Sequence, residues 1–151
     1  MKLGLPAVGL ALAALVSSAC TGIPNVVTST ASSPVGAPAA SLEGRTWRLV
    51  SIGGHPALAG VRVTAIFDKE VSRVAGSAGC NQYFGSAAVK ETRLEVGALG
   101  STKMFCTTDG VMEQESAYLE ALARATTYQL AGTRLQLGPA PGVVTLVFEA
   151  E

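Results

Sequence analysis

Three cysteines and one histidine are the residues of this chain that could support nucleophilic, redox or metal chemistry. A cysteine nucleophile needs a nearby base, and the only histidine, His55, lies in a Gly-Gly-His-Pro sequence that is typical of an exposed turn. A closed zinc site needs four ligands, and His55 with Cys80 and Cys106 does not supply them. Fingerprints for a serine nucleophile, a phosphate loop or a bound dinucleotide are also missing from the sequence. We therefore predict no catalytic residue, no metal site and no cofactor, and we assign no ligand-binding residue.

The first cysteine ends a segment that has the parts of a bacterial export signal. Lys2 supplies a positive charge, an apolar run covers residues 3–16, and small residues follow it. This pattern predicts a secretory signal peptide over residues 1–19, because the apolar run is too short for a membrane-spanning helix.

The end of the export segment also predicts a lipid anchor. Ser18-Ala19-Cys20 resembles the lipobox of bacterial lipoproteins, although that family prefers Leu or Val where this chain has Ser17. We predict that Cys20 carries fatty acyl chains, palmitate among them, because two or more acyl chains anchor a protein stably to a membrane. The alternative is cleavage near Ala19, which would give a soluble secreted protein.

Residues 20–41 join this anchor to the rest of the chain. After Cys20 they are rich in Ser, Thr, Ala, Pro and Gly, and they carry no charged residue. This composition predicts a flexible tether. The whole chain has 11 basic and 11 acidic residues and a formal net charge of zero, which argues against nucleic acid as a partner, since phosphate binding needs a basic surface.

With Cys20 lipidated, Cys80 and Cys106 remain as an even pair in an exported protein. An oxidising compartment favours a disulfide between them, which would close a loop of about 27 residues and stabilise the domain by about 3.5 kcal/mol in the chain-entropy model. Two buried free thiols are the structural alternative. The functional alternative is a thiol-dependent redox protein or enzyme that uses Cys80 and Cys106.

The stretch around Cys80, residues 76–85 with the sequence GSAGCNQYFG, combines glycines with a polar and an aromatic pair. Glycines in such a pattern indicate turns with positive φ or a close approach of two backbones. Asn81 suits a left-handed position or a side-chain bond to nearby backbone. Tyr83 and Phe84 would point to opposite faces of a strand, so we expect one to be buried and the other exposed.

Short strand patterns separated by turn sequences dominate residues 42–151, which we predict to form one domain. Val63, Ala65 and Phe67 alternate with Thr64 and would share one face of a strand. The segments with strand patterns are residues 46–52, 61–67, 71–75, 86–90, 93–96, 128–131, 133–137 and 143–148. Many short antiparallel strands and one helix predict an α+β fold, with a small curled antiparallel β-sheet or partial barrel and one packed α-helix.

The helix is predicted over residues 110–125. Asp109 would be its N-cap, and Glu113 and Glu115 lie in the early turns, where the helix dipole favours acids. A stripe at helical spacing is expected to face the sheet. Its members are Met112, Ser116, Leu119, Leu122 and Ala123.

Three ordered motifs resemble one known family. They are residues 79–85 (GCNQYFG), residues 102–106 (TKMFC), and residues 115–118 (ESAY) with Leu122, accompanied by Trp47 near the start and residues 135–137 near the end. The domain is similar to the META domain, also called HslJ-like, of bacterial envelope proteins and lipoproteins. The resemblance covers about residues 42–148 and implies a small curled antiparallel sheet with one helix and an envelope location. It implies no established catalytic activity, and members are linked to heat response, novobiocin resistance and motility or virulence.

We therefore expect a non-enzymatic protein, exported and lipid-anchored to the bacterial cell envelope, at the outer membrane or the cell membrane and with the periplasmic side favoured. Its partners would be the membrane, through the anchor, and an unknown envelope protein or hydrophobic ligand. A stress-protective structural lipoprotein that acts through its fold and location is a related hypothesis. The competing one is the thiol-dependent redox protein or enzyme.

Overall fold

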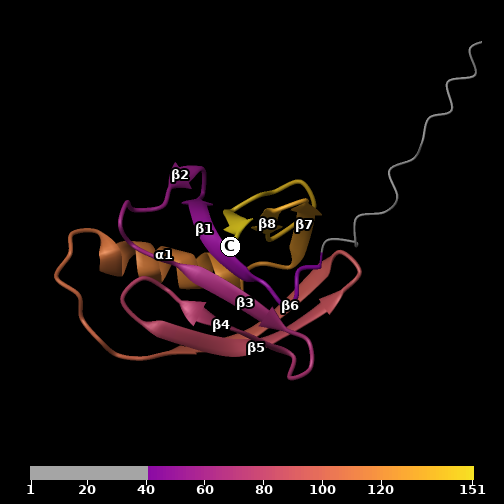
Figure 1. Ribbon diagram of the computed structural model, residues 1–151, viewed down its shortest axis with the longest axis horizontal. Helices are drawn as coiled ribbons and strands as arrows, with labels where there is room; N and C mark the ends of the chain where they lie inside the picture. Colours follow the sequence, from indigo (N-terminus) through magenta and orange to yellow (C-terminus); the bar gives the residue numbers. More distant parts are fainter. Residues whose placement is uncertain (1–40) are drawn as a thin grey trace, which may run out of the picture. The chain divides into compact units, whose positions relative to one another are not determined.

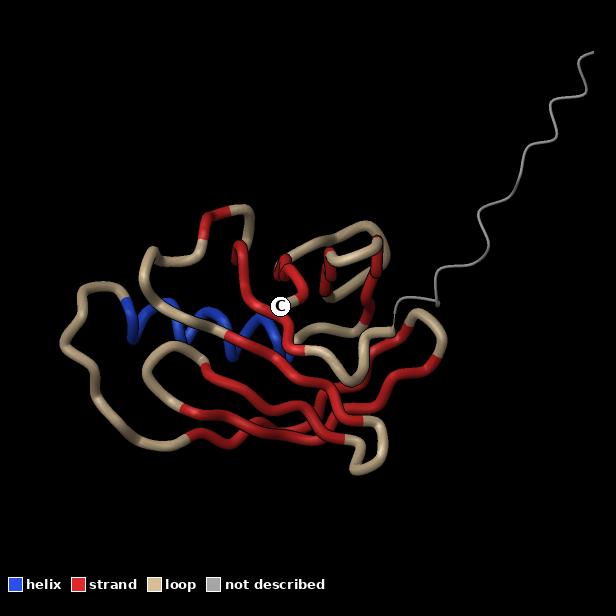
Figure 2. The backbone as a smooth tube through the Cα atoms, in the orientation of Figure 1, coloured by secondary structure: helices blue, strands red, loops and turns tan. Residues whose placement is uncertain are grey.

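The computed structural model describes residues 41–151. The predicted signal peptide, Cys20 and nearly all of the predicted tether therefore lie outside the described residues. The described part is a single helix combined with antiparallel strands (Figures 1 and 2). The strands are β1 (Thr46–Ile52), β2 (His55–Pro56), β3 (Thr64–Asp68), β4 (Arg73–Ser77), β5 (Gln82–Lys90), β6 (Arg93–Ser101), β7 (Thr127–Ala131), β8 (Arg134–Gly138) and β9 (Leu146–Ala150), and the helix is α1 (Val111–Ala123).

The strands form a closed barrel. Each strand from β3 to β8 pairs with the next one, β1 pairs with β3, and β1 also pairs with β9. The predicted antiparallel sheet with one helix is therefore present, but the sheet is closed rather than curled open or partial. Closure joins the first long strand to the last one, for example through the pairs Leu49↔Phe148 and Ile52↔Leu146, and it removes the exposed edges that an open sheet would leave.

The strands of the barrel are paired over unequal lengths. The β5–β6 hairpin is its longest pairing, whereas β6 and β7 meet in the single residue pair Arg93↔Thr127. The chain between these two strands contains α1, which packs against β1, β6 and β9. The helix brings its inward face against the core of the barrel.

Aromatic side chains fill the core. Trp47, Phe67, Tyr83, Tyr118 and Phe148 are all almost fully buried. The indole nitrogen of Trp47 donates a hydrogen bond to the Leu42 carbonyl at 2.7 Å, so the start of the described chain is fixed to the barrel. Such a bond satisfies the one polar group that burying a tryptophan takes away from water.

The helix differs from its prediction in both its cap and its buried face. Gly110, with φ of 76°, precedes the first turn, and no side chain caps it, so Asp109 is not the N-cap. The left-handed turn at Gly110 is a conformation that glycine adopts without a Cβ penalty. The buried face consists of Val111, Glu115, Tyr118 and Leu122, while Ser116 and Ala123 are exposed and Met112 and Leu119 are half-buried. Within the predicted stripe only Leu122 is fully buried and Leu119 packs partly against the core, whereas the carboxylate of Glu115 lies on the inward face in place of the other predicted members.

The glycine-rich stretch is divided between two strands and the turn that joins them. β4 ends at Ser77 and β5 begins at Gln82, earlier than the predicted strand at residue 86. Gly76 is required by a close approach, since a Cβ there would lie 2.1 Å from the Thr64 carbonyl oxygen. The prediction that Tyr83 and Phe84 face opposite sides is confirmed, because Tyr83 is buried and Phe84 is exposed.

Candidate functional site

A disulfide joins the turn after β4 to the loop before α1. Cys80 and Cys106 are bonded, with Cα atoms 5.9 Å apart and a sequence separation of 26. Cys80 is buried and Cys106 is half-buried. We call residues 79–82 and 102–106, together with this bond, the clasp.

A buried carboxylate holds the clasp to the helix. Glu115 projects from the inward face of α1, and its Oε2 accepts hydrogen bonds from the backbone nitrogens of Cys80 at 3.1 Å and Asn81 at 2.7 Å. Its Oε1 accepts a third bond, from Asn81 Nδ2 at 2.7 Å. Hydrogen bonds from N–H groups to an ionised carboxylate are roughly twice as strong as neutral ones. These three bonds explain why a charged side chain can lie on the face that packs against the barrel.

Asn81 connects the two halves of the clasp. Its Oδ1 accepts hydrogen bonds from Thr102 Oγ1 and from the Met104 backbone nitrogen, both at 2.7 Å. Its Nδ2, besides bonding Glu115, donates to the Met104 carbonyl at 3.1 Å. The Asn81 side chain does bond to backbone, but to that of Met104, 23 positions away, rather than to the nearby backbone that was predicted. With both ends of its amide occupied, this buried side chain fixes the path of residues 102–104.

The clasp presents two large apolar side chains to solvent. Met104 is 57% exposed and Phe105 is 80% exposed, although the residues on both sides of them are tied down by Asn81 and by the disulfide. The loop that carries them lies at one end of the domain's long axis, and the described chain begins toward the other end (Figure 1). An exposed apolar pair on a fixed backbone loses little conformational freedom when it binds. This pair is therefore suited to contact another molecule.

Two tyrosines form a polar centre inside the barrel, next to the clasp. The hydroxyls of Tyr83 and Tyr118 are 2.6 Å apart, and Tyr83 donates to the Thr64 carbonyl at 3.0 Å. Burial raises the pKa of both phenols; for Tyr118, the neighbouring Tyr83 raises the pKa further. The hydrogen bond from Tyr118 opposes this rise in the pKa of Tyr83. The neutral pair has its hydrogen bonds satisfied, and it contains no group that is ready to act as a base near neutral pH.

This pair predicts a loss of stability in alkali. A phenol whose pKa is raised by folding stabilises the native state below its unfolded value of 10.0, and that contribution is lost as pH rises above it. We expect the free energy of unfolding to fall by about 1.4 kcal/mol per phenol for each pH unit above 10. Urea unfolding at a series of pH values would measure this, and Tyr118→Phe should show about half the dependence. A free energy of unfolding that stays constant as the pH rises above 10.0 would contradict the prediction.

His55, the only histidine and the residue considered as a base for a cysteine nucleophile, is not part of the clasp. His55 is in the short strand β2 and is exposed, and within residues 41–151 no hydrogen bond links it to Cys80 or Cys106. No group of three or more His, Cys, Asp or Glu side chains arranged to hold a metal occurs among the described residues. The described part of the chain also contains no helix with the length and apolar character needed to cross a membrane. Cys20 lies outside the described residues.

Sequence reasoning missed the part that Glu115 plays. Glu115 was interpreted as a dipole-complementing acid, as Glu113 still can be, because hydrophobic periodicity excludes a charged residue from a buried stripe. The spacing along the helix could have indicated this role. Glu115 lies three residues before Tyr118 and seven before Leu122, and both of these residues are fully buried. That spacing places Glu115 on the inward side of the helix.

Comparisons with known proteins agree with this architecture. A family model, described as META domain, matches residues 40–151. No sequence among the curated proteins compared is a match. A protein from Burkholderia xenovorans, solved by NMR, is similar with 30% identity and a TM-score of 0.55, covering 73% of this chain and 83% of that one.

Two further solved structures show the fold alone. A second protein solved by NMR has 24% identity and a TM-score of 0.56, over 72% of this chain and 90% of that one. A DUF4847 family protein from Bacteroides vulgatus, solved by crystallography, has 16% identity and a TM-score of 0.54, over 72% of this chain and 93% of that one. Since the family model spans the whole described domain, this chain belongs to the META domain family.

Proposed function

We propose that this protein is a lipid-anchored, non-enzymatic binding module of the bacterial cell envelope, and that its clasp contacts a protein partner or a hydrophobic ligand through Met104 and Phe105. One observation carries the proposal: these two side chains are exposed although their backbone is held by a disulfide and by Asn81. A loop that only needed to be soluble would not require an apolar pair at this position.

The site fits binding better than catalysis. The carboxylate that holds the clasp to the helix, Glu115, already accepts three hydrogen bonds from the protein, so it is occupied as a structural acceptor. Large apolar side chains such as Phe and Met are enriched at protein interfaces. The support for the envelope location comes from the sequence: an export segment, a lipobox-like Cys20 and a tether precede the domain.

A thiol-dependent redox function is the second candidate, and the half-buried Cys106 is the observation that favours it. A redox-active disulfide must be reached by a thiolate and is labile to mild reductants. Counting free thiols before and after mild reduction separates the two functions, because a structural bridge stays oxidised under conditions that open a catalytic one. Reduction by glutathione alone would favour the redox candidate.

Phe105 is expected to dominate partner binding. Phe105→Ser should weaken retention of detergent-solubilised envelope proteins on the purified full-length chain by about 30-fold, since a central aromatic contact is worth about 2 kcal/mol or more. The folded state should be unaffected, because the side chain packs against little of the domain. Val144→Ser is the matched control, as it removes another exposed apolar side chain. Equal retention by wild type, Phe105→Ser and Val144→Ser would reject the clasp as the binding site.

The proposed lipidation of Cys20 can be measured separately from partner binding. Intact-mass spectrometry of protein extracted from membranes should report a lipid adduct on Cys20 and two missing hydrogens at the Cys80–Cys106 pair. Cys20→Ser should release the protein into the soluble exported fraction. An unmodified Cys20 in the membrane fraction would reject the anchor and leave the clasp experiment valid.

A further inference from the structure

A second apolar surface lies on the outer face of the barrel and shares no residue with the clasp. The register of the strands places Ile66, Ala75 and Phe84 side by side, with Gly100 as the next residue across. Ile66 is 42% exposed, Phe84 is 52% exposed, and Val71, in the turn between β3 and β4, is 65% exposed. Outward positions of an antiparallel sheet that faces water are usually polar, so this row needs an explanation.

Three adjoining depressions turn this row into one groove. Their volumes are about 380, 320 and 340 Å³. The first shares Ile66 and Asp68 with the second, and the second shares Val71 and Arg73 with the third, which reaches Phe84. Because neighbouring depressions share their walls, they form a continuous surface, which we call the β3–β5 groove.

The floor of the groove is rigid at its Phe84 end. The guanidinium of Arg73 lies over the Phe84 ring, 4.9 Å from its centroid. A Cβ on Gly100 would come within 3.4 Å of that ring, so the ring rests on the glycine of β6. The cation–π contact with Arg73 and the close packing on Gly100 hold the ring in position. The ring therefore offers a fixed apolar surface against which another side chain can pack.

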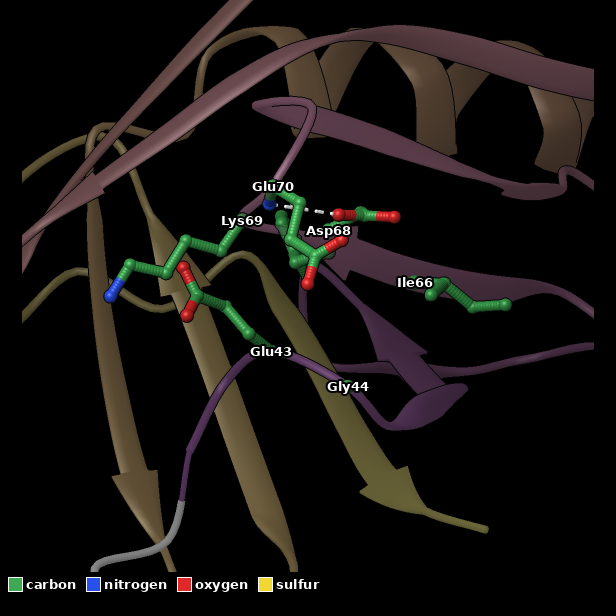
Figure 3. A pocket seen from close by; sticks show the side chains of 7 residues that line it. Glu43, Gly44, Ile66, Asp68, Lys69 and Glu70 are labelled. Atoms are coloured by element: carbon green, nitrogen blue, oxygen red, sulfur yellow. Dashed lines mark hydrogen bonds between the residues drawn. The ribbon is translucent and has the colours of Figure 1, made fainter.

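The other end of the groove is acidic. Glu43, Asp68 and Glu70 line its first depression together with Lys69, and Figure 3 shows the Lys69 side chain extending past Glu43, away from Asp68 and Glu70. Among the ion pairs of residues 41–151, none includes these acids or Arg73. The groove thus combines apolar surface with carboxylates that have no cationic partner within the described domain.

The geometry points to the β3–β5 groove as a docking site for a segment of a partner protein that carries apolar side chains next to a lysine or arginine. The apolar side chains pack on Ile66, Val71 and Phe84, and the basic residue lies at the acidic end. Charge complementarity selects this occupant. The three carboxylates of the groove (Glu43, Asp68 and Glu70) outnumber its two cations (Lys69 and Arg73), so an anionic lipid surface or an acidic peptide would be disfavoured. The site is separate from the one proposed at Met104 and Phe105.

A display library of random peptides, selected on the full-length chain with its disulfide intact, tests this inference. The selected peptides should be enriched in lysine or arginine beside apolar residues. Ile66→Ser should weaken their binding about tenfold, since losing part of an isoleucine's burial costs about 1.4 kcal/mol. Val144→Ser is the matched control because Val144 is 39% exposed against 42% for Ile66, and it should leave binding unchanged, as should Phe105→Ser.

The contribution of the acidic residues to peptide binding can be measured separately. Glu43→Gln with Glu70→Gln should weaken binding of the selected peptides by about threefold at low salt and reduce the salt dependence of binding, because exposed ion pairs are weak and are screened by salt. Selected peptides that bind Ile66→Ser as tightly as Val144→Ser, or that are acidic, would overturn the inference. It would also be overturned if the groove bound vesicles of anionic phospholipid, or if wild type but not Ile66→Ser formed dimers in sedimentation. Loss of peptide binding in Phe105→Ser alone would assign the peptides to the clasp and overturn the groove.

Discussion

Replacing Glu115 by alanine should cost this domain about 3–5 kcal/mol of its free energy of unfolding, because each buried donor left without a partner costs about 1–3 kcal/mol. Three donors lose their acceptor at once: the backbone nitrogens of Cys80 and Asn81 and the side-chain nitrogen of Asn81. Asn81 Nδ2 retains its bond to the Met104 carbonyl, so the expected loss of stability is smaller than that of three donors left entirely without partners. A domain whose total stability is about 5–15 kcal/mol would be brought close to unfolding.

Urea unfolding of the full-length chain, followed with the disulfide intact, measures this effect. Glu113→Ala is the matched control, since Glu113 is an exposed acid in the first turn of the same helix, and it should change stability by no more than about 0.5 kcal/mol. Glu115→Gln should fall between the two, because the amide retains one acceptor oxygen and places an NH₂ group where donors already point. Equal stabilities of Glu115→Ala and Glu113→Ala would show that the carboxylate does not hold the clasp.

Removing the disulfide should have the second largest effect. The double variant Cys80→Ala with Cys106→Ala should lose about 3.5 kcal/mol, because the bridge no longer restricts a loop of about 27 residues in the unfolded chain. Changing both cysteines together avoids a single free thiol that could form mixed disulfides. We also expect chymotrypsin to cut after Met104 or Phe105 more readily in the variant, since the hydrogen bonds of residues 102–104 to Asn81 and Gln82 then hold that segment without the covalent bond.

Denaturant unfolding and a timed chymotrypsin digest measure these two effects. Cys20→Ser retains the bridge and should keep the wild-type stability of the domain, so it separates loss of the disulfide from loss of any cysteine. If the double variant were as stable as Cys20→Ser, the bridge would not contribute to the fold, and a thiol-based activity would become the better explanation of the cysteine pair.

The two proposed surfaces fix their exposed apolar side chains in different ways. Met104 and Phe105 are presented by covalent and polar ties of their backbone to the barrel and the helix. Ile66 and Phe84 are presented by the sheet itself, with Arg73 and Gly100 fixing the ring of Phe84. Because the two surfaces share no residue, Phe105→Ser and Ile66→Ser can be compared directly, and each serves as the control for the other.

The sequence by itself determined the features that depend on local patterns. Alternation predicted most of the strands, and it correctly separated Tyr83 from Phe84, because neighbouring residues of any strand point to opposite sides. The motifs at residues 79–85 and 102–106 predicted the META domain family, which the match over residues 40–151 confirms. The expectation of a lipid anchor at Cys20 stays a prediction, since it depends on residues outside the described domain.

Only the tertiary structure decided how these elements meet. The pairing of β1 with β9 closes the barrel between segments at opposite ends of the domain sequence, and no local period encodes a contact at such a separation. Glu115 is buried because donors from a turn 34 positions earlier satisfy it, whereas hydrophobic spacing treats every carboxylate as exposed. For the same reason the inward face of α1 was predicted wrongly: whether a charged side chain can be buried depends on the partners that the fold brings to it.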